Sequence, residues 1–378
     1  MIVPSRRESR WLPGFFLNIE LASICLLRYV LIAMNKKVSF MRNFFCAAAF
    51  FGMMAVAAQE VVPPSSPYKE TEIASIKGTV FQYATFGSWP QTVKDETVTV
   101  DENKSVEVGA FVYCLGNDGE WYAKVLENSW DNEYKYSDGS FVGQDGKTFR
   151  WFKVEPIKWR VLFVEVDGTK LLLSENVLIN GRYYDTGNAD RETVLPNNYK
   201  ESRVRAFLNG LSYNKSGEVC NEFDGKGFLQ TAFSLAEREA IQTTNVDNSV
   251  ESALPDNYVY LLESRKAKFW NNGVNKNVCD NTDDKVFLLS EREATASEYG
   301  FEMYNIFGAG NSRIKMSTDF AKASGVYVDG TFGSWWWLRS PEDSYENYAR
   351  IINFDGNAHY SGNGRNGYGG IVPALRVK

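Results

Sequence analysis

The side chains best suited to chemistry lie in a 24-residue segment near the C-terminus, from Asn347 to Gly370. This segment is mostly Asn, Gly, Tyr and Ser, with one Asp, one His and two Arg, and it contains no Lys, Glu, Gln, Met or Trp. Short amides and hydroxyls adapt their hydrogen bonds, and phenol rings supply contact area at a low entropy cost. The composition is typical of binding loops and favours recognition over catalysis.

We expect this C-terminal segment to form an exposed face that contacts a protein or a glycan on another cell, phage or host surface. Replacing Tyr360 and Tyr368 by Ala should abolish binding and leave the melting temperature nearly unchanged, if both rings are exposed. The residues predicted to contact the ligand are Asn347, Tyr348, Asn353, Asp355, Asn357, His359, Tyr360, Asn363, Arg365, Asn366 and Tyr368.

The sequence contains few residues suited to catalysis, metal binding or cofactor binding. His359 is the single histidine, which excludes a multi-histidine metal centre. Gly362 to Gly367 has the spacing of a dinucleotide fingerprint, but only 11 residues follow it, too few for the required strand, turn and helix. Asp280 to Asp284 and the surroundings of Asp355 lack the EF-hand pattern. We therefore predict no catalytic residue, no metal and no cofactor.

A tryptophan-rich stretch precedes the segment and is predicted to be its scaffold. On a strand, Trp335 and Trp337 share one face and Trp336 takes the other. Two interpretations stay open, since the three rings can all belong to the core or some can line a ligand platform. Arg339 either pairs with an internal acid or clamps a ligand carboxylate.

Strand patterns flank a central helical region. Lys158 to Val166 and Lys170 to Ser174 are rich in aliphatic and β-branched residues and are joined by Asp167-Gly168, a strong hairpin signal. Residues 91–150 have turn signals between short strand patterns, and Ile371 to Val377 forms a closing strand.

Two amphipathic helices are predicted between these strands, at Asn198 to Asn209 and at Phe228 to Ile241. Ser234 and Glu237 have the spacing of a capping box, which places a helix start near Ser234. Strands followed by helices and then by strands predict an α+β domain with an antiparallel sheet, two or more helices and long loops.

Four segments divide the chain. Residues 34–58 combine a basic start, an apolar run at 44–54 and small residues at the end, as a secretory signal peptide does. Residues 1–33 are either a mis-assigned upstream segment or a membrane anchor. Residues 59–77 are predicted to be a linker, and 78–378 a single domain. We expect an exported protein of the cell envelope, periplasm or extracellular space, with no membrane span in the mature chain.

Charge and cysteine content narrow the choice of partners. Of 41 basic and 47 acidic residues, 34 and 45 lie after residue 58, so the mature part carries a net charge of −11. Such a chain repels phosphate backbones, and we expect no nucleic-acid partner. Cys220 and Cys279 can pair in an exported protein, or they and Cys114 can remain unpaired thiols.

Several short motifs, in order, resemble those of a widespread bacterial domain of unknown function. They are Leu171-Leu172-Leu173-Ser174-Glu175, Arg205-Ala206-Phe207-Leu208-Asn209, Phe287-Leu288-Leu289-Ser290-Glu291, Trp336-Trp337-Leu338-Arg339-Ser340-Pro341 and Pro373-Ala374-Leu375.

The resemblance covers roughly Gly78 to Lys378 and carries expectations about fold and function. It implies the C-type-lectin-like fold shared with formylglycine-generating enzymes, although the late cysteine pair of those enzymes is missing here, because no cysteine follows Cys279. Some members resemble the variable proteins of diversity-generating retroelements, whose C-terminal segment is rewritten at adenines. The residue types between Asn347 and Gly370 are those that adenine changes in Asn codons produce.

The sequence therefore predicts an exported ligand-binding protein. Two alternatives stay open. A glycan-active hydrolase would use two carboxylates, although Glu342, Asp343 and Glu346 are more simply explained as a solvated loop. A structural module of the cell envelope would bury the C-terminal segment against another surface.

Overall fold

The structure, a computed structural model, describes residues 63–184, 195–215, 217–255, 279–305 and 308–378. The predicted upstream segment and signal peptide lie outside the described residues. Residues 61–378 form one compact unit. The part of the predicted linker that the structure describes contains a strand, Lys69–Ile76, so regular structure begins before Gly78.

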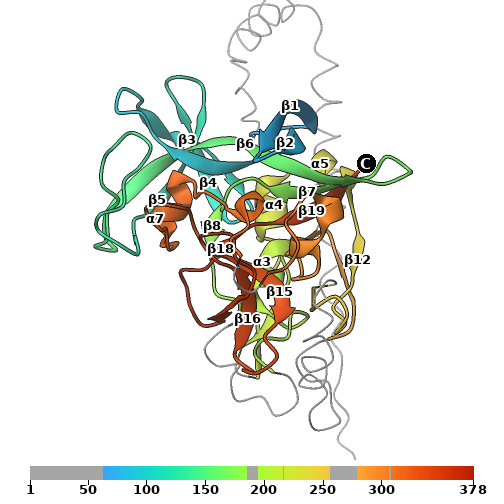
Figure 1. Cartoon of the computed structure of the whole chain (residues 1–378). Coiled ribbons are helices and arrows are strands. Elements are labelled where there is room, and N and C mark those ends of the chain that lie inside the picture. Colours follow the sequence, from blue (N-terminus) through green and yellow to red (C-terminus); the bar gives the residue numbers. More distant parts are fainter. Residues whose placement is uncertain (1–62, 185–194, 216, 256–278, 306–307) are drawn as a thin grey trace, which may run out of the picture. The chain divides into compact units, whose positions relative to one another are not determined.

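The larger sheet has ten strands, and its strand pairs are antiparallel throughout the described residues. Figure 1 shows its long members β2 and β6 above the second sheet. The strands are β1 (Lys69–Ile76), β2 (Thr79–Val93), β3 (Val100–Val108), β4 (Phe111–Gly116), β5 (Trp121–Leu126), β6 (Phe149–Val164), β7 (Lys170–Ser174), β11 (Ile241–Gln242), β14 (Val286–Phe287) and β19 (Ala374–Val377).

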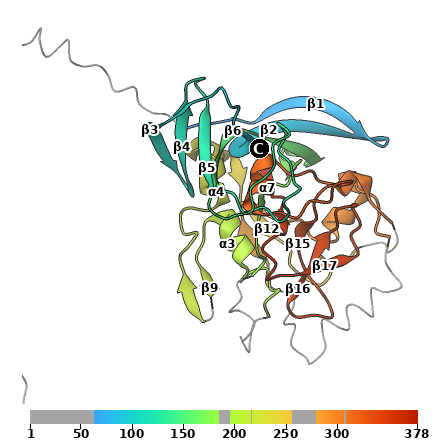
Figure 2. The ribbon, with the colours of Figure 1, turned by 90° about the vertical axis from the view of Figure 1, so that its left-hand side faces the viewer.

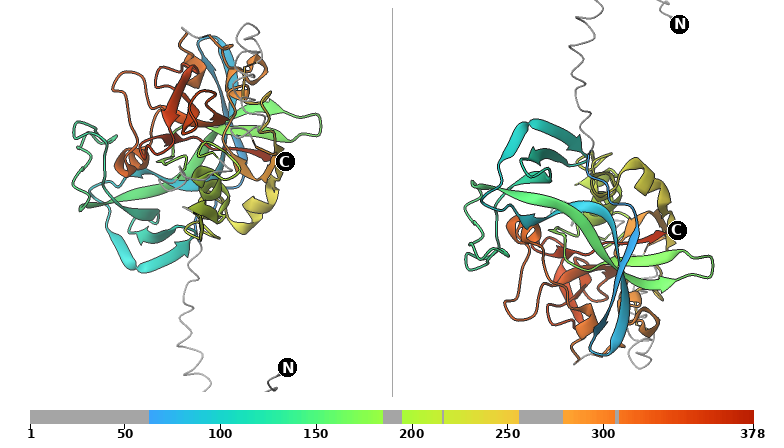
Figure 3. Two further views of the ribbon diagram at one scale, coloured as in Figure 1. Left: turned by 90° about the horizontal axis from the view of Figure 1, so that it is seen from below. Right: turned by 90° about the horizontal axis from the view of Figure 1, so that it is seen from above.

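Strand β6 organises this sheet. Phe152 pairs with β5 and β2, and Trp159 pairs with β7 and β2, so β5 and β7 share one edge of β6 while β2 follows the other. The view from above in Figure 3 shows β2 running along β6. The predicted hairpin is confirmed, because β6 and β7 pair across a turn in which Asp167 accepts a hydrogen bond from the Thr169 backbone and Gly168 has a φ of +89°.

The second sheet has five strands, in the order β17, β16, β15, β18, β8, and β15 pairs with β18 in parallel. They are β8 (Ile179–Asn180), β15 (Trp336–Pro341), β16 (Tyr348–Ile352), β17 (Tyr360–Asn363) and β18 (Gly370–Ile371). Two further antiparallel sheets have two strands each, β9 (Tyr213–Lys215) with β10 (Glu218–Cys220) and β12 (Thr244–Val246) with β13 (Thr282–Asp284).

The helices in the described part of the chain are short. They are α3 (Arg203–Asn209), α4 (Phe228–Ala232), α5 (Leu235–Ala240) and α7 (Asp319–Ser324), with the 3-10 turns η2 (Glu293–Thr295), η3 (Ser297–Tyr299) and η4 (Asn311–Arg313). The Ser234–Glu237 capping box is confirmed. The predicted helix 228–241 is wrong as a single element, because Phe233 is extended and Ser234 caps a new helix.

The predicted α+β, C-type-lectin-like fold is wrong. The structure has 39% strand and only 12% helix, so it is mostly β-sheet and not a clear lectin-like fold. The sequence overstated the helices because each pattern extends beyond its cap. Ser202 starts α3 well after Asn198, and Gly210, with a φ of +67°, ends it.

Strands buried on both faces explain the continuous apolar runs. In β7, Leu171 and Leu173 pack in one hydrophobic cluster, and Leu172 packs in another. Strand β15 divides in the same way, since Trp337 belongs to one cluster and Trp336 to the other. Such double burial replaces the alternation of a half-exposed strand. Hydrophobic periodicity alone therefore cannot show which face of these strands packs against which hydrophobic cluster.

Candidate ligand-binding site

A cleft of about 690 Å³ lies between α3, β8 and the loop before β6. Its lining includes Trp130 from that loop, Arg203 and Phe207 from α3, and Tyr368 from the C-terminal segment. In Figure 2, β9, which contributes Lys215 to the lining, lies on one side of α3, and β15 to β17 lie on the other. The volume falls within the range of about 300 to 1,000 Å³ that small-ligand sites occupy.

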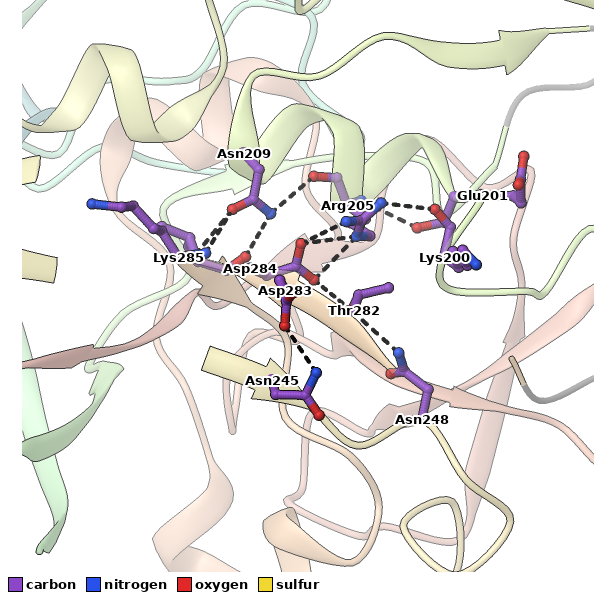
Figure 4. A network of polar contacts seen from close by, with 12 residues as sticks. Lys200, Glu201, Arg205, Asn209, Asn245, Asn248, Thr282, Asp283, Asp284 and Lys285 are labelled. Atoms are coloured by element: carbon purple, nitrogen blue, oxygen red, sulfur yellow. Dashed lines mark hydrogen bonds and ion pairs between the residues drawn. The ribbon is translucent and has the colours of Figure 1, made fainter. Parts of the chain in front are cut away.

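The wall of the cleft formed by α3 is anchored from behind. Arg203 and Phe207 are four residues apart and share the side of α3 that lines the cleft. Arg205 leaves another side and binds Asp284, with Nε 2.9 and 3.1 Å from its two carboxylate oxygens (Figure 4). Asp284 is 1% exposed, so this ion pair is largely removed from solvent.

A second anchor lies one turn further along α3. The Asn209 amide donates to the Val286 carbonyl at 2.8 Å, and its oxygen accepts from the backbone N–H groups of Lys285 and Val286 at 3.1 Å (Figure 4). The Thr282 hydroxyl donates to Asp284 at 2.7 Å. These contacts hold α3 against β13 and β14, so this wall of the cleft is preformed.

Another wall of the cleft is aromatic. The centroids of the Trp130 and Tyr368 rings are 4.2 Å apart, and Tyr368 also contacts Trp335 edge to face at 5.7 Å. Trp130 remains 46% exposed, so its indole is available to a ligand. Burial raises the pKa of the Tyr368 phenol, which stays neutral and able to donate a hydrogen bond near neutral pH.

A strip of aromatic rings continues from this wall. Tyr327 contacts both Trp130 and Phe354, at centroid distances of 6.4 and 6.2 Å. Phe354 stacks on Phe332, which is 45% exposed. We call Trp130, Tyr327, Phe332, Phe354 and Tyr368 the aromatic strip. It connects the cleft to the turn after β16.

The C-terminal segment is clamped where it enters the cleft. The Asn180 amide donates to the Gly367 carbonyl at 2.6 Å, and the Gly181 N–H donates to the Gly369 carbonyl at 2.8 Å. The Trp337 indole N–H donates to the Gly181 carbonyl at 2.8 Å. A Cβ atom on Gly369 would lie 2.2 Å from Trp337 Nε1, so only glycine permits this approach.

The described lining of the cleft carries three cations, Arg182, Arg203 and Lys215, and one acid, Glu222. Arg203 binds Glu222 at 2.8 Å, and its guanidinium carbon lies 4.7 Å from the centre of the Phe223 ring. Glu222 also accepts from the Tyr213 hydroxyl at 3.0 Å. Arg203 is therefore held in place, and cations outnumber acids among the described lining residues.

The predicted contact residues divide into three groups. Asn347, Tyr348, Asn363 and Arg365 meet at one end of the β16–β17 pair, where Tyr348 is opposite Asn363 and Asn363 accepts from the Arg365 backbone at 3.1 Å. Arg365 is exposed, whereas the other three are half-buried. This group surrounds the end of the sheet and lies outside the lining of the cleft.

The second group builds the turn at the other end of β16. Asp355 accepts hydrogen bonds from the Asn353 amide at 3.1 Å and from the Asn357 backbone at 3.0 Å. Asn357 is 6% exposed and accepts from the His359 backbone at 2.8 Å, and the His359 ring hydrogen-bonds the Tyr304 hydroxyl. These polar groups already have partners within the fold, so they shape the turn.

The remaining predicted residues are Tyr360, Asn366 and Tyr368. Tyr360 is 48% exposed on the edge strand β17, opposite Ile351, and Asn366 is half-buried in the turn after it. Tyr368 alone of the eleven predicted residues lines the cleft. Sequence reasoning missed Trp130, although a tryptophan within a polar, turn-rich loop is a usable signal for a binding site.

The scaffold residues are all buried. Trp335 is 7% exposed, and Trp336 and Trp337 are fully buried, so these rings belong to the core. Arg339 is buried and binds Glu293, which favours the internal-acid interpretation over a ligand clamp.

Of the three acids that were expected in a solvated loop, Glu346 is exposed, but Glu342 and Asp343 are buried. Arg350 lies 3.1 Å from Glu342 and 3.3 Å from Asp343, and those two acids are 6% and 8% exposed. Arg350 also lies 3.5 Å from the buried Glu291. Burial, together with a hydrogen bond that the protonated Glu342 donates to Asp343, raises the pKa of Glu342. These acids hold the chain at the end of β15 and do not line the cleft.

Other candidate chemistry is limited in the described ranges. No group of three or more His, Cys, Asp and Glu side chains there could hold a metal ion. Cys114, Cys220 and Cys279 are free thiols, so the proposed Cys220–Cys279 disulfide is not formed. Among the described helices, none has the length and apolar character needed to cross a membrane.

The fold and the cleft define a β-rich domain whose cleft is walled in part by its C-terminal segment. The chain belongs to a family described as Domain of unknown function (DUF6273), whose model matches residues 167–378. The match begins at the β6–β7 turn and includes α3, the second sheet and the whole C-terminal segment, but not Trp130. Neither a curated protein nor a solved structure matches this sequence.

Proposed function

We propose that this protein is an exported binding protein that recognises a protein or glycan ligand through the cleft and the adjoining C-terminal segment. The observation that carries the proposal is the contact between Tyr368, a residue of that segment, and the exposed Trp130 in the wall of the cleft. Aromatic side chains of this kind dominate binding energies because they bury a large area with little loss of rotamer entropy.

Preorganisation supports the same proposal. The Arg205–Asp284 pair fixes one wall, and the clamp at Gly367 and Gly369 fixes the other. A site that is already formed loses less conformational entropy on binding, which strengthens affinity without additional contacts. Export rests on the signal-peptide pattern at residues 34–58.

A hydrolase with paired carboxylates has less support. Such enzymes need two carboxyl groups about 5 to 9.5 Å apart across the scissile bond. Among the described residues that line the cleft, Glu222 is the single acid, and it is bound to Arg203 and Tyr213. Binding without hydrolysis is therefore the function that we propose.

The retroelement resemblance gives the proposal a further part, that the exposed positions of the segment vary between copies of this protein. Arg365 and Tyr360 are exposed and can change without loss of the fold, whereas Asn357 is buried and should remain constant. A near-repeat of the codons for residues 340–375 that differs only at adenines, beside a reverse transcriptase gene, would support this part. A genomic neighbourhood with neither feature would refute it.

The test is an array of defined surface proteins and glycans, probed with the labelled chain. We expect binding to at least one component, weakened about tenfold by Trp130→Ala, a loss of about 1.4 kcal/mol. Phe149→Ala is the matched control, because Phe149 is 56% exposed on β6 and does not line the cleft. An array without any binding, equal effects of the two variants, or release of shortened saccharides would each overturn the proposal.

A further inference from the structure

The charge of the cleft opposes that of the chain. The chain carries a formal net charge of −6, yet the described charged residues that line the cleft are three cations and one acid. A concave site lined by one sign of charge concentrates ligands of the other sign. Glu222 is bound to Arg203 at 2.8 Å, and the formal charge of the described lining residues is positive.

The aromatic strip is the second feature that indicates the class of ligand. Trp130 and Tyr368 stand at the cleft, and Tyr327, Phe354 and Phe332 continue from them with neighbouring centroids 6.2 to 6.4 Å apart. The face of an aromatic ring carries negative partial charge, so it attracts the weakly positive C–H groups on the face of a sugar ring. A row of such rings suits a chain of sugar units better than a single one.

From these two observations we infer that the cleft and the aromatic strip bind an acidic oligosaccharide, with sugar rings against Trp130 and acidic groups toward Arg182, Arg203 and Lys215. This inference rests on the proposed function and names its ligand class. Arg203 is suited to the role, because Glu222 and the Phe223 ring orient its guanidinium before a ligand arrives.

A flexible acidic peptide would use the charges but would leave the strip unexplained. A neutral glycan would use the strip but not the cations. An acidic saccharide uses both, whether its charge comes from uronic carboxylates or from sulfate esters. The two sources share their chemistry, an anionic oxygen group on a sugar ring, and guanidinium groups bind both by charge-assisted hydrogen bonds.

Four probes separate these contributions in a calorimetric titration of the intact protein. They are hexagalacturonate, a sulfated glucose hexasaccharide, maltohexaose and a polyacrylate of matched charge. We expect one or both acidic saccharides to bind at least about tenfold more tightly than maltohexaose, which lacks charge, and than polyacrylate, which lacks sugar rings. Raising the salt from about 0.05 M to about 0.5 M should weaken the binding of the acidic saccharides.

Variants locate the site. Arg182→Gln should weaken binding of the acidic saccharide about threefold, and a double variant with Lys215→Gln about tenfold. Lys104→Gln removes the same charge from β3, outside the cleft, and should leave affinity unchanged. Trp130→Ala should weaken binding while the salt dependence persists, because it removes the ring and keeps the cations.

The outcomes also distinguish this inference from the proposed function. Binding of a protein on the array without binding of either acidic saccharide would overturn the inference and leave the proposed function standing. Equal affinity for maltohexaose, or equal effects of Arg182→Gln and Lys104→Gln, would overturn it as well. If the chain binds nothing on the array and none of the four probes, both fail.

Discussion

The rings of Trp130 and Tyr368 lie 4.2 Å apart between centroids, although one belongs to the loop before β6 and the other to the turn before β18. The Asn128 N–H donates to the Ala323 carbonyl of α7 at 2.8 Å, and the Tyr327 N–H donates to the Tyr368 carbonyl at 3.0 Å. Helix α7 and the segment after it therefore connect the two parts of the chain that carry these rings. The cleft therefore depends on a contact between Trp130, which lies outside the part of the chain that the family model matches, and Tyr368, which lies inside it.

Tyr368 and Tyr360 should differ in their effect on stability, contrary to the expectation from sequence that replacing both leaves the melting temperature nearly unchanged. Tyr368 is half-buried between Trp130 and Trp335, so Tyr368→Ala should lower the free energy of unfolding by about 1 to 2 kcal/mol. Tyr360 is 48% exposed, and Tyr360→Ala should change it by less than about 0.5 kcal/mol. Urea unfolding of both variants measures the difference, and equal losses would contradict the placement of Tyr368.

Two adjacent acids on β13 give a matched pair of variants. Asp284 is 1% exposed and binds Arg205, so Asp284→Asn should lower the free energy of unfolding by about 2 to 3 kcal/mol by leaving the cation with a weaker partner. Asp283 is exposed and only accepts from Asn245 at 2.8 Å, so Asp283→Asn should change it by less than about 0.5 kcal/mol.

The same pair tests whether α3 positions the cleft. Because Arg205 holds the helix that carries Arg203, Asp284→Asn should also weaken ligand binding, whereas Asp283→Asn should not. Chemical denaturation and titration on the same samples provide both measurements. A stability loss without a change in affinity would mean that α3 keeps its place without this ion pair.

Local signals in the sequence predicted individual elements of the fold well. Asp167-Gly168 fixed the β6–β7 hairpin, and Ser234 with Glu237 marked the start of α5, because turn and capping chemistry depend on neighbouring residues. The fold class was wrong because it depends on how distant strands pair. No local pattern indicates that β2 and β5 will take opposite edges of β6.

The candidate site was predicted only in part for a similar reason. Composition drew attention to the segment from Asn347 to Gly370, and Tyr368 does line the cleft. Composition does not show which polar groups are satisfied inside the fold, as Asn357 is by the backbone of His359. The contribution of Trp130 is also a long-range contact, which a single sequence does not reveal.

Lys315 should make stability depend on pH. Burial, with the neighbouring Arg160, lowers its pKa from 10.5 to about 7, although Glu175 lies 3.2 Å away. Above about pH 7 the folded state loses this proton while the unfolded state keeps it, so the free energy of unfolding rises with pH. The limiting slope for one proton is about 1.4 kcal/mol per pH unit.

The window for this measurement is about pH 7 to about pH 9. Below this window Lys315 is charged in both the folded and the unfolded state. Above it the Cys279 thiol opposes the trend, because burial raises its pKa from 9.0 to about 11 and it therefore ionises first in the unfolded state. Urea unfolding across the window should show the rise in the natural protein and not in Lys315→Met. If the free energy of unfolding rises with the same slope in both proteins, a titratable group other than Lys315 causes the rise.

Gly369 should be intolerant of a single added methyl group. A Cβ atom there would meet Trp337 Nε1 at 2.2 Å and the Trp335 ring at 2.6 Å, and both rings are buried and cannot move aside. Gly369→Ala should therefore lower the free energy of unfolding by about 1 to 3 kcal/mol, as overpacking of a core does. Gly330→Ala is the control, since no atom lies within 4 Å of its added Cβ, and it should be neutral or slightly stabilising.

The two glycine variants also test whether the clamp shapes the cleft. Displacing Gly369 would shift the neighbouring Tyr368 away from Trp130, so indole fluorescence should change in Gly369→Ala and stay unchanged in Gly330→Ala. Unfolding curves and emission spectra of the two proteins measure stability and ring contact separately. Loss of stability with an unaltered spectrum would show that the Trp130–Tyr368 contact does not depend on the close packing of Gly369 against the buried indoles.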